Sequence, residues 1–462
     1  MGLKIVVLAA GQGTRMKSSL PKVLHPLAGK PMLAHVIDAA RALSPTSIIV
    51  VCGHQKQAIQ QAFANQALEF VEQVPQQGTA DAVLKALPKI NTNEKVLILY
   101  GDVPLISTET LNQLVEKTKD GLGIITLTMG NPFGLGRIVR DNNGNVLKVV
   151  EQKDATEQEQ KICEINTGIY LVPGHLLHKW VPQIQNKNKQ NEFYLTDIVE
   201  MAAKEGINIF TLAPLHIEDI LGVNDQAQLA QVERAYQYKM ANALMAKGVT
   251  LADPGRLDVR GKLDVQSEVF IDINAIFEGQ VTLKKGCHIG PNCILKNATL
   301  GENVTVLANC YLEDVTIDDN ATVGPFARLR PGTKLGQSVR VGNFVEIKNA
   351  TIGNHSKINH LSYVGDATIG NDVNIGAGTI TCNYDGANKH HTIIEDEVFI
   401  GSDTQLIAPI RVGKGATIGA GSTVNKDVPE NQLTLTHQLN QRSKKWARPK
   451  KSTTPNNKQE NP

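Results

Sequence analysis

The sequence predicts two fold classes in one chain: an α/β doubly wound, Rossmann-like domain, followed by a left-handed parallel β-helix built from hexapeptide repeats. Three observations lead to this prediction. Apolar runs alternate with helical stretches in the first half, an apolar strand at residues 4–10 opens into a glycine-rich loop, and aliphatic residues recur every six positions in the second half. A chain of 462 residues is long enough to form two or more cores.

Composition excludes several classes of protein. The formal net charge is +2, which indicates no polyanion-binding surface, and we expect no nucleic-acid partner. No apolar stretch reaches the about 18 residues of a membrane-spanning helix, and the N-terminus lacks a signal-peptide pattern. The six cysteines form no C-x-x-C pair, which favours free thiols in a reducing compartment. We therefore expect a cytoplasmic protein without membrane insertion.

The loop after the first strand has the residue types that hold phosphate. Gly11 and Gly13 remove the Cβ atoms that keep phosphate away from backbone N–H groups, while Arg15 and Lys22 supply positive charge. The loop is neither a Walker A sequence nor a full dinucleotide-binding fingerprint. Two glycines alone would also fit an ordinary strand-to-helix turn, and the spacing of the two basic residues favours phosphate binding.

Apolar runs at residues 48–51 and 96–100 are typical of buried parallel strands, and residues 32–43 and 110–117 are predicted to be helices between them. Ligands of such sheets bind at the carboxyl ends of the strands. Besides the glycine loop, residues 76–79 and 101–104 fall at these ends.

Asp102 directly follows an apolar strand, where a carboxylate is costly unless it is paired or bound to metal. Mg²⁺ prefers one or two carboxylates together with substrate phosphates, which suits this position. The alternative is an Asp that caps the next turn. The phosphate loop at the same end of the sheet favours the metal.

The domain boundaries follow from a change of pattern. Residues 141–145 are predicted to be a hairpin turn, and residues 225–247, without internal Gly or Pro, are predicted to be one long helix. We expect a first domain at 1–226, a helical linker at 227–247, a β-helix at 248–437, and a basic, disordered tail at 438–462.

The six-residue period groups aliphatic residues in threes, and successive triplets begin 17 or 18 residues apart. Three inward aliphatics per coil describe a three-sided parallel β-helix, and this period fits neither an amphipathic helix nor a simple strand. The predicted core positions are Leu283, Ile289, Leu295, Leu300, Val306, Leu312, Ile317, Val323, Leu329, Leu335, Val341, Ile347, Ile352, Ile358, Val364, Ile369, Ile375, Ile394, Ile400, Leu406, Val412, Ile418 and Val424.

The period breaks once, because the triplet expected near residue 387 begins at Ile394. About seven residues within 382–391 therefore leave the coil, and solenoids often place function in such excursions. A tolerated insertion is the alternative.

His360 lies two positions after a core aliphatic residue, which places it at the surface of the prism. Glu346, Lys348, Arg328 and Arg330 come one or two coils earlier. A lone His is usually inert, but a His near a carboxylate and basic groups is a candidate general base, with Glu346 orienting its ring.

Together these residues resemble a bacterial family of bifunctional enzymes, N-acetylglucosamine-1-phosphate uridylyltransferase / glucosamine-1-phosphate N-acetyltransferase, over residues 1 to about 448. The resemblance rests on the motifs LAAGQGTRM at 8–16, LPKVL at 20–24, YGDVPL at 100–105, EINTGIY at 164–170, GVN at 222–224, RLRPG at 328–332, VGNFVEIK at 341–348, HLSY at 360–363 and NIGAGTITCNYDG at 374–386.

The resemblance implies two transferase reactions. The β-helix would move acetyl from acetyl-CoA to glucosamine 1-phosphate, and the α/β domain would join the product to UTP with release of pyrophosphate. It also implies Mg²⁺, a cytoplasmic homotrimer formed through the β-helix, and a product that feeds peptidoglycan and lipopolysaccharide (lipid A) synthesis.

The resemblance assigns site residues position by position. The residues expected to act in catalysis are His360, Glu346, Arg15 and Lys22. The UDP-N-acetylglucosamine site would comprise Leu8, Ala9, Ala10, Gly11, Lys22, Gln73, Gly78, Thr79, Tyr100, Gly101, Asp102, Gly136, Glu151, Asn166 and Asn224, with Asp102 and Asn224 holding Mg²⁺. The acetyl-acceptor site would comprise Arg330, Lys348, Tyr363 and Asn374. Acetyl-CoA would contact Ala377, Asn383, Tyr384, Ser402, Ala420 and His437.

The chain departs from the family pattern at His437, where an Arg that contacts the coenzyme is often found. Arg442, Lys444 and Lys445 are candidate substitutes. Two other functions fit parts of the sequence. A monofunctional sugar-1-phosphate nucleotidyltransferase would use the β-helix only for oligomerisation or regulation, and a non-catalytic scaffold or ice-binding solenoid would show regular rows of surface Thr. The excursion and His360 disfavour the first, and the mixed polar surface disfavours the second.

Overall fold

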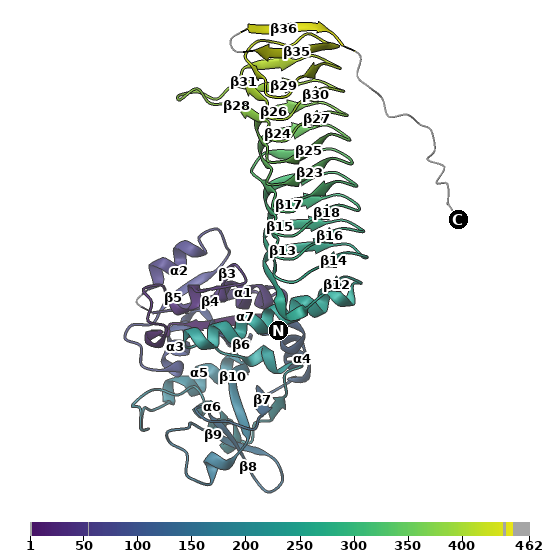
Figure 1. The fold of residues 1–462 in the computed structure, drawn as a ribbon. Coiled ribbons are helices and arrows are strands. Elements are labelled where there is room, and N and C mark those ends of the chain that lie inside the picture. The colour runs from purple at the N-terminus through teal and green to yellow at the C-terminus, as the bar shows by residue number, and fades with distance from the viewer. Residues whose placement is uncertain (1, 54, 438–439, 447–462) are drawn as a thin grey trace, which may run out of the picture. The chain divides into compact units, whose positions relative to one another are not determined.

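The computed structural model describes residues 2–53, 55–437 and 440–446, and the chain divides into two compact units between Tyr236 and Gln237 (Figure 1). The predicted tail therefore lies outside the described residues at 438–439 and 447–462. None of the helices in the described ranges is long and apolar enough to cross a membrane.

A nine-stranded sheet forms the centre of the first unit, with the strand order β11-β7-β10-β6-β1-β4-β5 (Figure 1). In addition, β8 pairs with β10, and β9 pairs with β8. The strands predicted at 4–10, 48–51 and 96–100 are confirmed as β1, β4 and β6. The strands are β1 (Leu3–Ala9), β4 (Ser47–Cys52), β5 (Glu69–Glu72), β6 (Lys95–Tyr100), β7 (Leu122–Thr128), β8 (Arg137–Arg140), β9 (Val146–Val150), β10 (Glu164–Pro173) and β11 (Ile209–Leu212), besides a small pair formed by β2 (Pro26–Leu27) and β3 (Lys30–Pro31).

Helices cover both faces of this sheet, as the doubly wound prediction requires. Along β1, Val6 and Leu8 pack into a core with α3, α5 and α6, whereas Ile5 and Val7 pack into a second core with α1 and α4. One difference is that β10 runs antiparallel to both β6 and β7, so the sheet is mixed. The helices are α1 (Met32–Arg41), α2 (Lys56–Ala62), α3 (Thr79–Ala86), α4 (Thr108–Lys117), α5 (Gly174–Trp180) and α6 (Asp197–Lys204).

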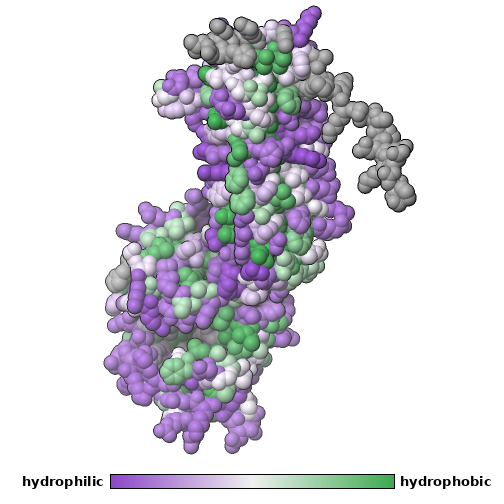
Figure 2. Space-filling view, viewed as in Figure 1, coloured by the Kyte–Doolittle hydropathy of each residue, from purple (hydrophilic) through white to green (hydrophobic). Residues whose placement is uncertain are grey.

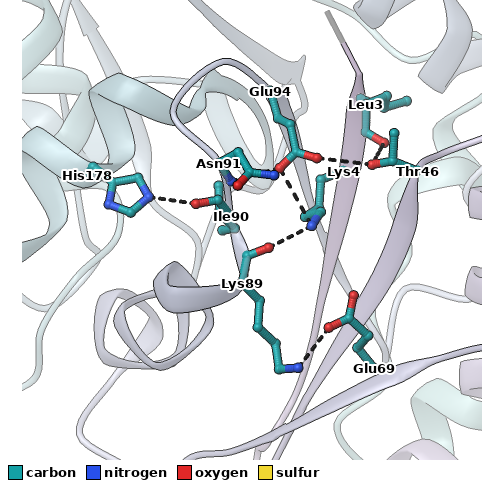
Figure 3. Close-up of polar contacts among 9 residues, drawn as sticks. All are labelled: Leu3, Lys4, Thr46, Glu69, Lys89, Ile90, Asn91, Glu94 and His178. Carbon is teal, nitrogen blue, oxygen red and sulfur yellow. Dashed lines mark hydrogen bonds and ion pairs between the residues drawn. The ribbon is translucent and has the colours of Figure 1, made fainter.

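A polar network fixes the start of β1, at the end opposite the glycine loop (Figure 3). The Lys4 ammonium donates to the Lys89 carbonyl at 2.6 Å and lies 3.6 Å from the Glu94 carboxylate. Glu94 also accepts from the Thr46 hydroxyl at 3.3 Å, and His178 contacts the neighbouring Ile90 carbonyl at 2.8 Å. Each of these charged groups has protein partners, so the network serves the fold.

The first half of α7 (Gln226–Ala246) belongs to the first unit. Val232 is buried in a cluster with Met16, Leu27 and Met32, and the Glu233 carboxylate accepts the backbone N–H of Ala28 at 2.7 Å. The helix predicted at 225–247 is confirmed, but the compact unit ends within it rather than at residue 226.

The second unit is a three-sided parallel β-helix. One face is a 12-stranded sheet, and a 13-stranded sheet bends around a corner to form the other two, because β19 pairs with both β21 and β22. The first face contains β12 (Thr250–Leu251), β14 (Phe270–Ile271), β16 (His288–Ile289), β18 (Thr305–Val306), β20 (Thr322–Val323), β23 (Arg340–Asn343), β25 (Lys357–His360), β27 (Asn374–Ile375), β30 (Phe399–Ile400), β33 (Thr417–Ile418), β35 (Gln432–His437) and β36 (Asn440–Lys445).

The bent sheet contains β13 (Leu257–Val265), β15 (Ala275–Leu283), β17 (Ile294–Leu300), β19 (Tyr311–Ile317), β21 (Arg328–Leu329), β22 (Thr333–Leu335), β24 (Glu346–Ile352), β26 (Tyr363–Ile369), β28 (Ile380–Cys382), β29 (Thr392–Ile394), β31 (Gln405–Ile407), β32 (Ile410–Val412) and β34 (Thr423–Val424). Pairing begins at Thr250, so the coils start before Leu283, the first core position predicted from the six-residue period. At the other end, β36 adds a strand inside the segment that the sequence assigns to the tail.

All the aliphatic residues predicted from the six-residue period lie in one core and are at most 3% exposed. The excursion is also confirmed, because Ile369 of β26 pairs with Ile394 of β29 and the segment between β28 and β29 projects from the coils (Figure 1).

Asn and Asp side chains form a column along one corner, where left-handed backbone angles favour them. Asn297 bonds Asp314 at 2.9 Å, and Asn349 bonds Asp366 at 2.7 Å. Asn383 completes the column by donating to Asp366 at 2.5 Å, which anchors the base of the excursion.

A fragment ending at Tyr236 should be more stable than one ending at Gln226. The shorter fragment exposes the cluster around Met16 and Leu27 and loses the Glu233 bond, so its free energy of unfolding should fall by roughly 3 kcal/mol. Urea unfolding of the two fragments measures the difference. Equal midpoints and equal slopes would show that α7 adds nothing to the first unit.

Candidate functional site

A cavity of about 410 Å³ opens at the carboxyl ends of β1 and β6. Ten of the residues predicted for a nucleotide-sugar site line it: Leu8, Ala9, Ala10, Gly11, Lys22, Gln73, Gly78, Thr79, Tyr100 and Asp102. Five lining residues were not predicted: Gln12, Val23, Gln76, Ala82 and Glu192. The sequence carried a signal for two of them, because Gln12 belongs to the glycine loop and Gln76 to the loop at 76–79.

The glycine loop is shaped around Lys22. Gly13 has a positive φ of 63°, and a Cβ there would come within 2.8 Å of the Lys22 Cβ. A Cβ on Gly11 would lie 3.9 Å from the Lys22 Cε, so the long side chain runs past this glycine into the cavity. Arg15, in the short helix Thr14–Met16, is exposed and does not line the cavity.

Lys22, Asp102 and Asn224 converge at the cavity. The Lys22 ammonium forms an ion pair with the Asp102 carboxylate and lies 3.3 Å from the Asn224 side-chain oxygen. The backbone N–H of Val223 donates to the Asp102 carbonyl at 2.9 Å, and Gln228 of α7 accepts the N–H of Asn224 at 2.7 Å. Two oxygen atoms from distant segments are thus held around one positive charge.

This pair of oxygens suits a hard cation that takes its other ligands from phosphate and water. Across residues 2–53, 55–437 and 440–446, no group of three or more His, Cys, Asp or Glu side chains is placed to hold a metal. A metal ion at Asp102 and Asn224 would therefore take its further ligands from the phosphates of a bound substrate and from water.

The first turn of α3 faces the same cavity. Gly78 precedes the helix with a φ of 120°, and a Cβ there would come within 2.5 Å of the Phe193 carbonyl. The amide of Gln73 donates to the Gly78 carbonyl and to Asp81, each at 2.8 Å. The eight-residue helix begins at the cavity wall, where the positive end of its dipole favours an anion.

Three other predicted residues, Gly136, Glu151 and Asn166, gather beyond the lining. The N–H of Asn166 donates to the Gly136 carbonyl at 2.9 Å, and a Cβ on Gly136 would lie 3.4 Å from both carboxylate oxygens of Glu151. Gly168 has a φ of 82° and lets the Tyr100 ring approach. Burial raises the pKa of the Glu151 carboxyl and, more strongly, that of the Tyr100 hydroxyl.

The second unit gathers basic groups on consecutive coils. Arg330 and Lys348 are neighbours across β21 and β24, where the Arg330 N–H donates to the Ile347 carbonyl at 2.8 Å. The Arg330 guanidinium pairs with Glu346 at 2.8 Å. Lys389 of the excursion lies against Lys348, and this neighbouring ammonium lowers the pKa of Lys389. Two adjacent ammonium groups favour an anion between them.

Tyr363 lies beside these basic groups. A Cβ on Gly365 would come within 2.4 Å of the Tyr363 hydroxyl and 2.9 Å of the Asn383 amide, so this glycine makes room for both. Lys389 was not predicted as a site residue, although its place in the excursion was the signal that pointed to it.

Hydrogen bonds shape the excursion into a short hairpin. The Asp385 carboxylate accepts the N–H groups of Ala387 at 2.8 Å and Asn388 at 2.7 Å, and it lies 2.7 Å from His390 Nε2. The N–H of His390 donates to the Asn383 carbonyl at 2.8 Å. The bonds that the Asp385 carboxylate receives from the Asn388 N–H, the His390 side chain and the Ala387 N–H lower the pKa of Asp385. The hairpin holds Lys389 opposite Tyr384.

His360 ends β25 and is exposed, as predicted, but its partner differs from the expected one. Its Nδ1 lies 2.8 Å from the side-chain oxygen of Asn343, whereas Glu346 pairs with Arg330. The reason is geometric: β25 and β23 belong to one face, and Glu346 opens β24 on another. Glu346 therefore does not hold the His360 ring within one chain.

The predicted coenzyme contacts continue the row of His360. Backbone bonds run from Gly378 N–H to the His360 carbonyl at 3.3 Å, from Asp403 N–H to the Ala377 carbonyl at 2.7 Å, and from Gly421 N–H to the Ser402 carbonyl at 2.8 Å. The row thus reads His360, Ala377, Ser402 and Ala420, with small side chains after the imidazole. Asn374 begins β27 in the coil after His360. The side chains of His437, Arg442 and Lys444 lie outside the described part.

Four known families match parts of the chain. Residues 5–155 match the MobA-like NTP transferase domain, and residues 312–407 match the GMPPB C-terminal domain. Residues 391–426 match the bacterial transferase hexapeptide, and residues 280–313 match the hexapeptide repeat of succinyl-transferase. These matches agree with an α/β nucleotidyltransferase domain followed by a left-handed parallel β-helix.

A solved structure of UDP-glucose pyrophosphorylase complexed with UDP-glucose aligns with 52% of this chain and all of that chain, at 18% identity and a TM-score of 0.44. A likeness of this size adds nothing to the argument.

Curated relatives match nearly the whole chain. The "Bifunctional protein GlmU" of Cupriavidus pinatubonensis is 52% identical over 97% of this chain and 99% of its own length. The proteins of the same name from Nitrosospira multiformis and Herminiimonas arsenicoxydans are also 52% identical, over 98% and 97% of this chain. With both halves matched at this identity, the chain belongs to the family of the bifunctional protein GlmU.

Proposed function

We propose that the second unit transfers acetyl from acetyl-CoA to glucosamine 1-phosphate, and that the first unit then joins N-acetylglucosamine 1-phosphate to UTP with release of pyrophosphate. The observation that carries this proposal is that each unit holds its own cluster of chemically suitable groups. A phosphate loop with a cation site lies in the first unit, and an imidazole near a basic cluster lies in the second. Membership of a bifunctional family supports two activities in one chain.

Uridylyl transfer needs neutralisation of charge more than it needs a base. A phosphate monoester is largely dianionic at pH 7, so the sugar phosphate attacks without losing a proton. Its oxygen forms a bond to the α-phosphorus of UTP as the bond to pyrophosphate breaks. Lys22 and the N-terminus of α3 would stabilise the phosphates, and the carbonyl and N–H groups of residues 8–11 would hold the nucleotide. Arg15 lies outside the cavity and would have to turn inward to contact a phosphate.

Asp102 and Asn224 would hold Mg²⁺. Bound there, the ion would neutralise charge on the phosphates during the transfer. Lys22 now balances the Asp102 carboxylate, and it would turn toward the phosphate when the ion and substrate enter. Glu151, with Gly136 and Asn166, would bind the hydroxyl and amide groups of the sugar, where its raised pKa matters less than its acceptor oxygens.

Acetyl transfer needs a neutral amine. Arg330, Lys348 and Tyr363, together with Lys389, would bind the phosphate of glucosamine 1-phosphate, and Asn374 would bind the sugar. The amine nitrogen attacks the thioester carbonyl, the carbon–sulfur bond breaks, and His360 takes the amine proton. The small side chains of Ala377, Ser402 and Ala420 would leave room for the coenzyme, with Asn383, Tyr384 and His437 as further contacts.

We also propose a homotrimer formed through the β-helix. Phe326, Phe344 and Leu361 are 49%, 57% and 63% exposed on successive coils, and the two Phe rings stack with centroids 5.3 Å apart. Figure 2 shows apolar side chains gathered in rows along this unit between polar ones. An exposed apolar row on a repeating face is typical of a surface buried in an oligomer.

In this proposal the enzyme works in the cytoplasm and supplies peptidoglycan and lipopolysaccharide synthesis. A monofunctional nucleotidyltransferase whose β-helix serves only for assembly remains the second candidate. It is disfavoured because it leaves the paired Lys348 and Lys389 and the braced excursion without a use.

Reciprocal substitutions test the assignment of two reactions to two units. Asp102→Ala should lower uridylyl transfer by at least about a hundredfold, because it removes the carboxylate that anchors the cation. His360→Ala should lower acetyl transfer by roughly two to four orders of magnitude, the usual contribution of a general base. Pyrophosphate release from UTP and thiol release from acetyl-CoA measure the two activities separately.

Each variant should leave the other activity at the parent rate. Asp120→Ala, on the surface of the first unit, and His288→Ala, on the same face of the β-helix as His360, are matched controls that should retain both activities. Parent-level uridylyl transfer by Asp102→Ala, or parent-level acetyl transfer by His360→Ala, would contradict the corresponding assignment.

Phe344→Asp should disrupt the trimer, because assembly would bury a carboxylate in an apolar interface. Light scattering at micromolar concentration should give three times 50.1 kDa for the parent and a smaller mass for the variant. Phe133→Asp, at an 80% exposed position in the first unit, should remain trimeric. A parent protein of one chain mass, or a variant of unchanged mass, would refute the proposed surface.

A further inference from the structure

Asn343 forms one hydrogen bond to His360 and one to the residue that follows it. Its side-chain oxygen lies 2.8 Å from His360 Nδ1, and its backbone carbonyl accepts the N–H of Leu361 at 3.1 Å. The two residues are paired in register on β23 and β25, so the contact is part of the ladder between coils. The equivalent position in the following coil is Ala377, which has no polar side chain to compete for the ring.

The chemistry of the contact fixes the proton on the ring. An amide oxygen only accepts hydrogen bonds, so the Nδ1 beside it carries the hydrogen. In a neutral imidazole, Nε2 then keeps its lone pair, and this nitrogen lies on the far side of the ring from Asn343. Rotation of the ring would break the bond, so the contact also limits the directions in which Nε2 points.

We propose that Asn343 is the positioning residue of the acetyltransferase site: its side-chain oxygen holds His360 in the Nδ1–H tautomer with Nε2 aimed at the amine. The inference rests on the proposed acetyl transfer. In the reaction, Nε2 accepts the amine proton as the carbon–nitrogen bond forms and the carbon–sulfur bond breaks. The imidazolium then returns that proton to the departing thiolate of the coenzyme, and Asn343 accepts the Nδ1 hydrogen throughout.

The neutral amide is suited to this role. A carboxylate at position 343 would favour the imidazolium, so less of the neutral base would be present at a given pH. The strand neighbours of β25 contribute one titratable residue, Arg340 of β23, whereas the described residues of β27 contribute none, and Lys357 lies on β25 itself.

Two substitutions in the full-length protein separate orientation from packing. Asn343→Ala removes the acceptor, and acetyl transfer should lose about tenfold to a hundredfold in kcat, the cost of a misplaced catalytic group, with KM for glucosamine 1-phosphate nearly unchanged. Asn343→Asp keeps an acceptor of the same shape. It should recover most of kcat at high pH, while the acid limb of the pH–rate profile moves up by about one pH unit.

A matched control removes a similar bond elsewhere. The Asn354 side-chain oxygen accepts the N–H of Gln337 at 2.8 Å between two coils, away from His360. Asn354→Ala should keep the parent kcat and the parent pH profile. Uridylyl transfer should stay at the parent rate in all three variants, because the substitutions lie in the second unit.

The result that overturns the inference differs from the one that overturns the proposed function. If His360→Ala acetylates at the parent rate, the function of the site is wrong. If His360→Ala is impaired but Asn343→Ala keeps the parent kcat, the positioning role is wrong. A loss in Asn343→Ala that Asn343→Asp neither recovers nor converts into a shifted acid limb would assign the effect to coil packing and would also overturn it.

Discussion

Parallel strand pairing is the constraint on which both sites depend. In the first unit Leu8 pairs with Tyr100, so the loops that follow these strands, with Gly11 and Asp102, leave the sheet side by side. In the β-helix the same rule places His360 beside Asn343, although 17 residues of chain separate them. Parallel pairing aligns like ends of different strands, and this alignment brings chemical groups from distant segments to one edge or one row.

The charged groups are arranged differently in the two sites. In the first, the Lys22 ammonium is balanced by the Asp102 carboxylate, so a ligand must separate an existing pair. In the second, Lys389 lies against Lys348, and the lowered pKa of Lys389 reflects their repulsion. A bound phosphate would relieve that repulsion and raise the pKa of Lys389 again. At the nucleotide site, a bound ligand would therefore replace one partner of the Lys22–Asp102 ion pair. At the acceptor site, the two ammonium groups would attract an anion directly.

Local patterns predicted much of this molecule. The six-residue period identified the β-helix core because one inward aliphatic residue per face produces a repeat that is visible in the sequence. The excursion was visible for the same reason, as a break in that period. The partner of His360 was not visible, since it depends on which face each strand occupies. Glu346 is closer in sequence, but it opens a strand on another face, where it pairs with Arg330. The boundary within α7 also escaped prediction, because Val232 is buried in a cluster with residues as distant in the sequence as Met16 and Leu27.

Product analysis tests the central claim, that one chain carries out two successive transfers. The purified protein is incubated with glucosamine 1-phosphate, acetyl-CoA, UTP and Mg²⁺, and the products are identified by mass. We expect UDP-N-acetylglucosamine, pyrophosphate and free coenzyme A, with N-acetylglucosamine 1-phosphate as the intermediate when UTP is omitted. Conversion of supplied N-acetylglucosamine 1-phosphate without any acetylation of glucosamine 1-phosphate would contradict the account and leave a nucleotidyltransferase with a β-helix that has another role.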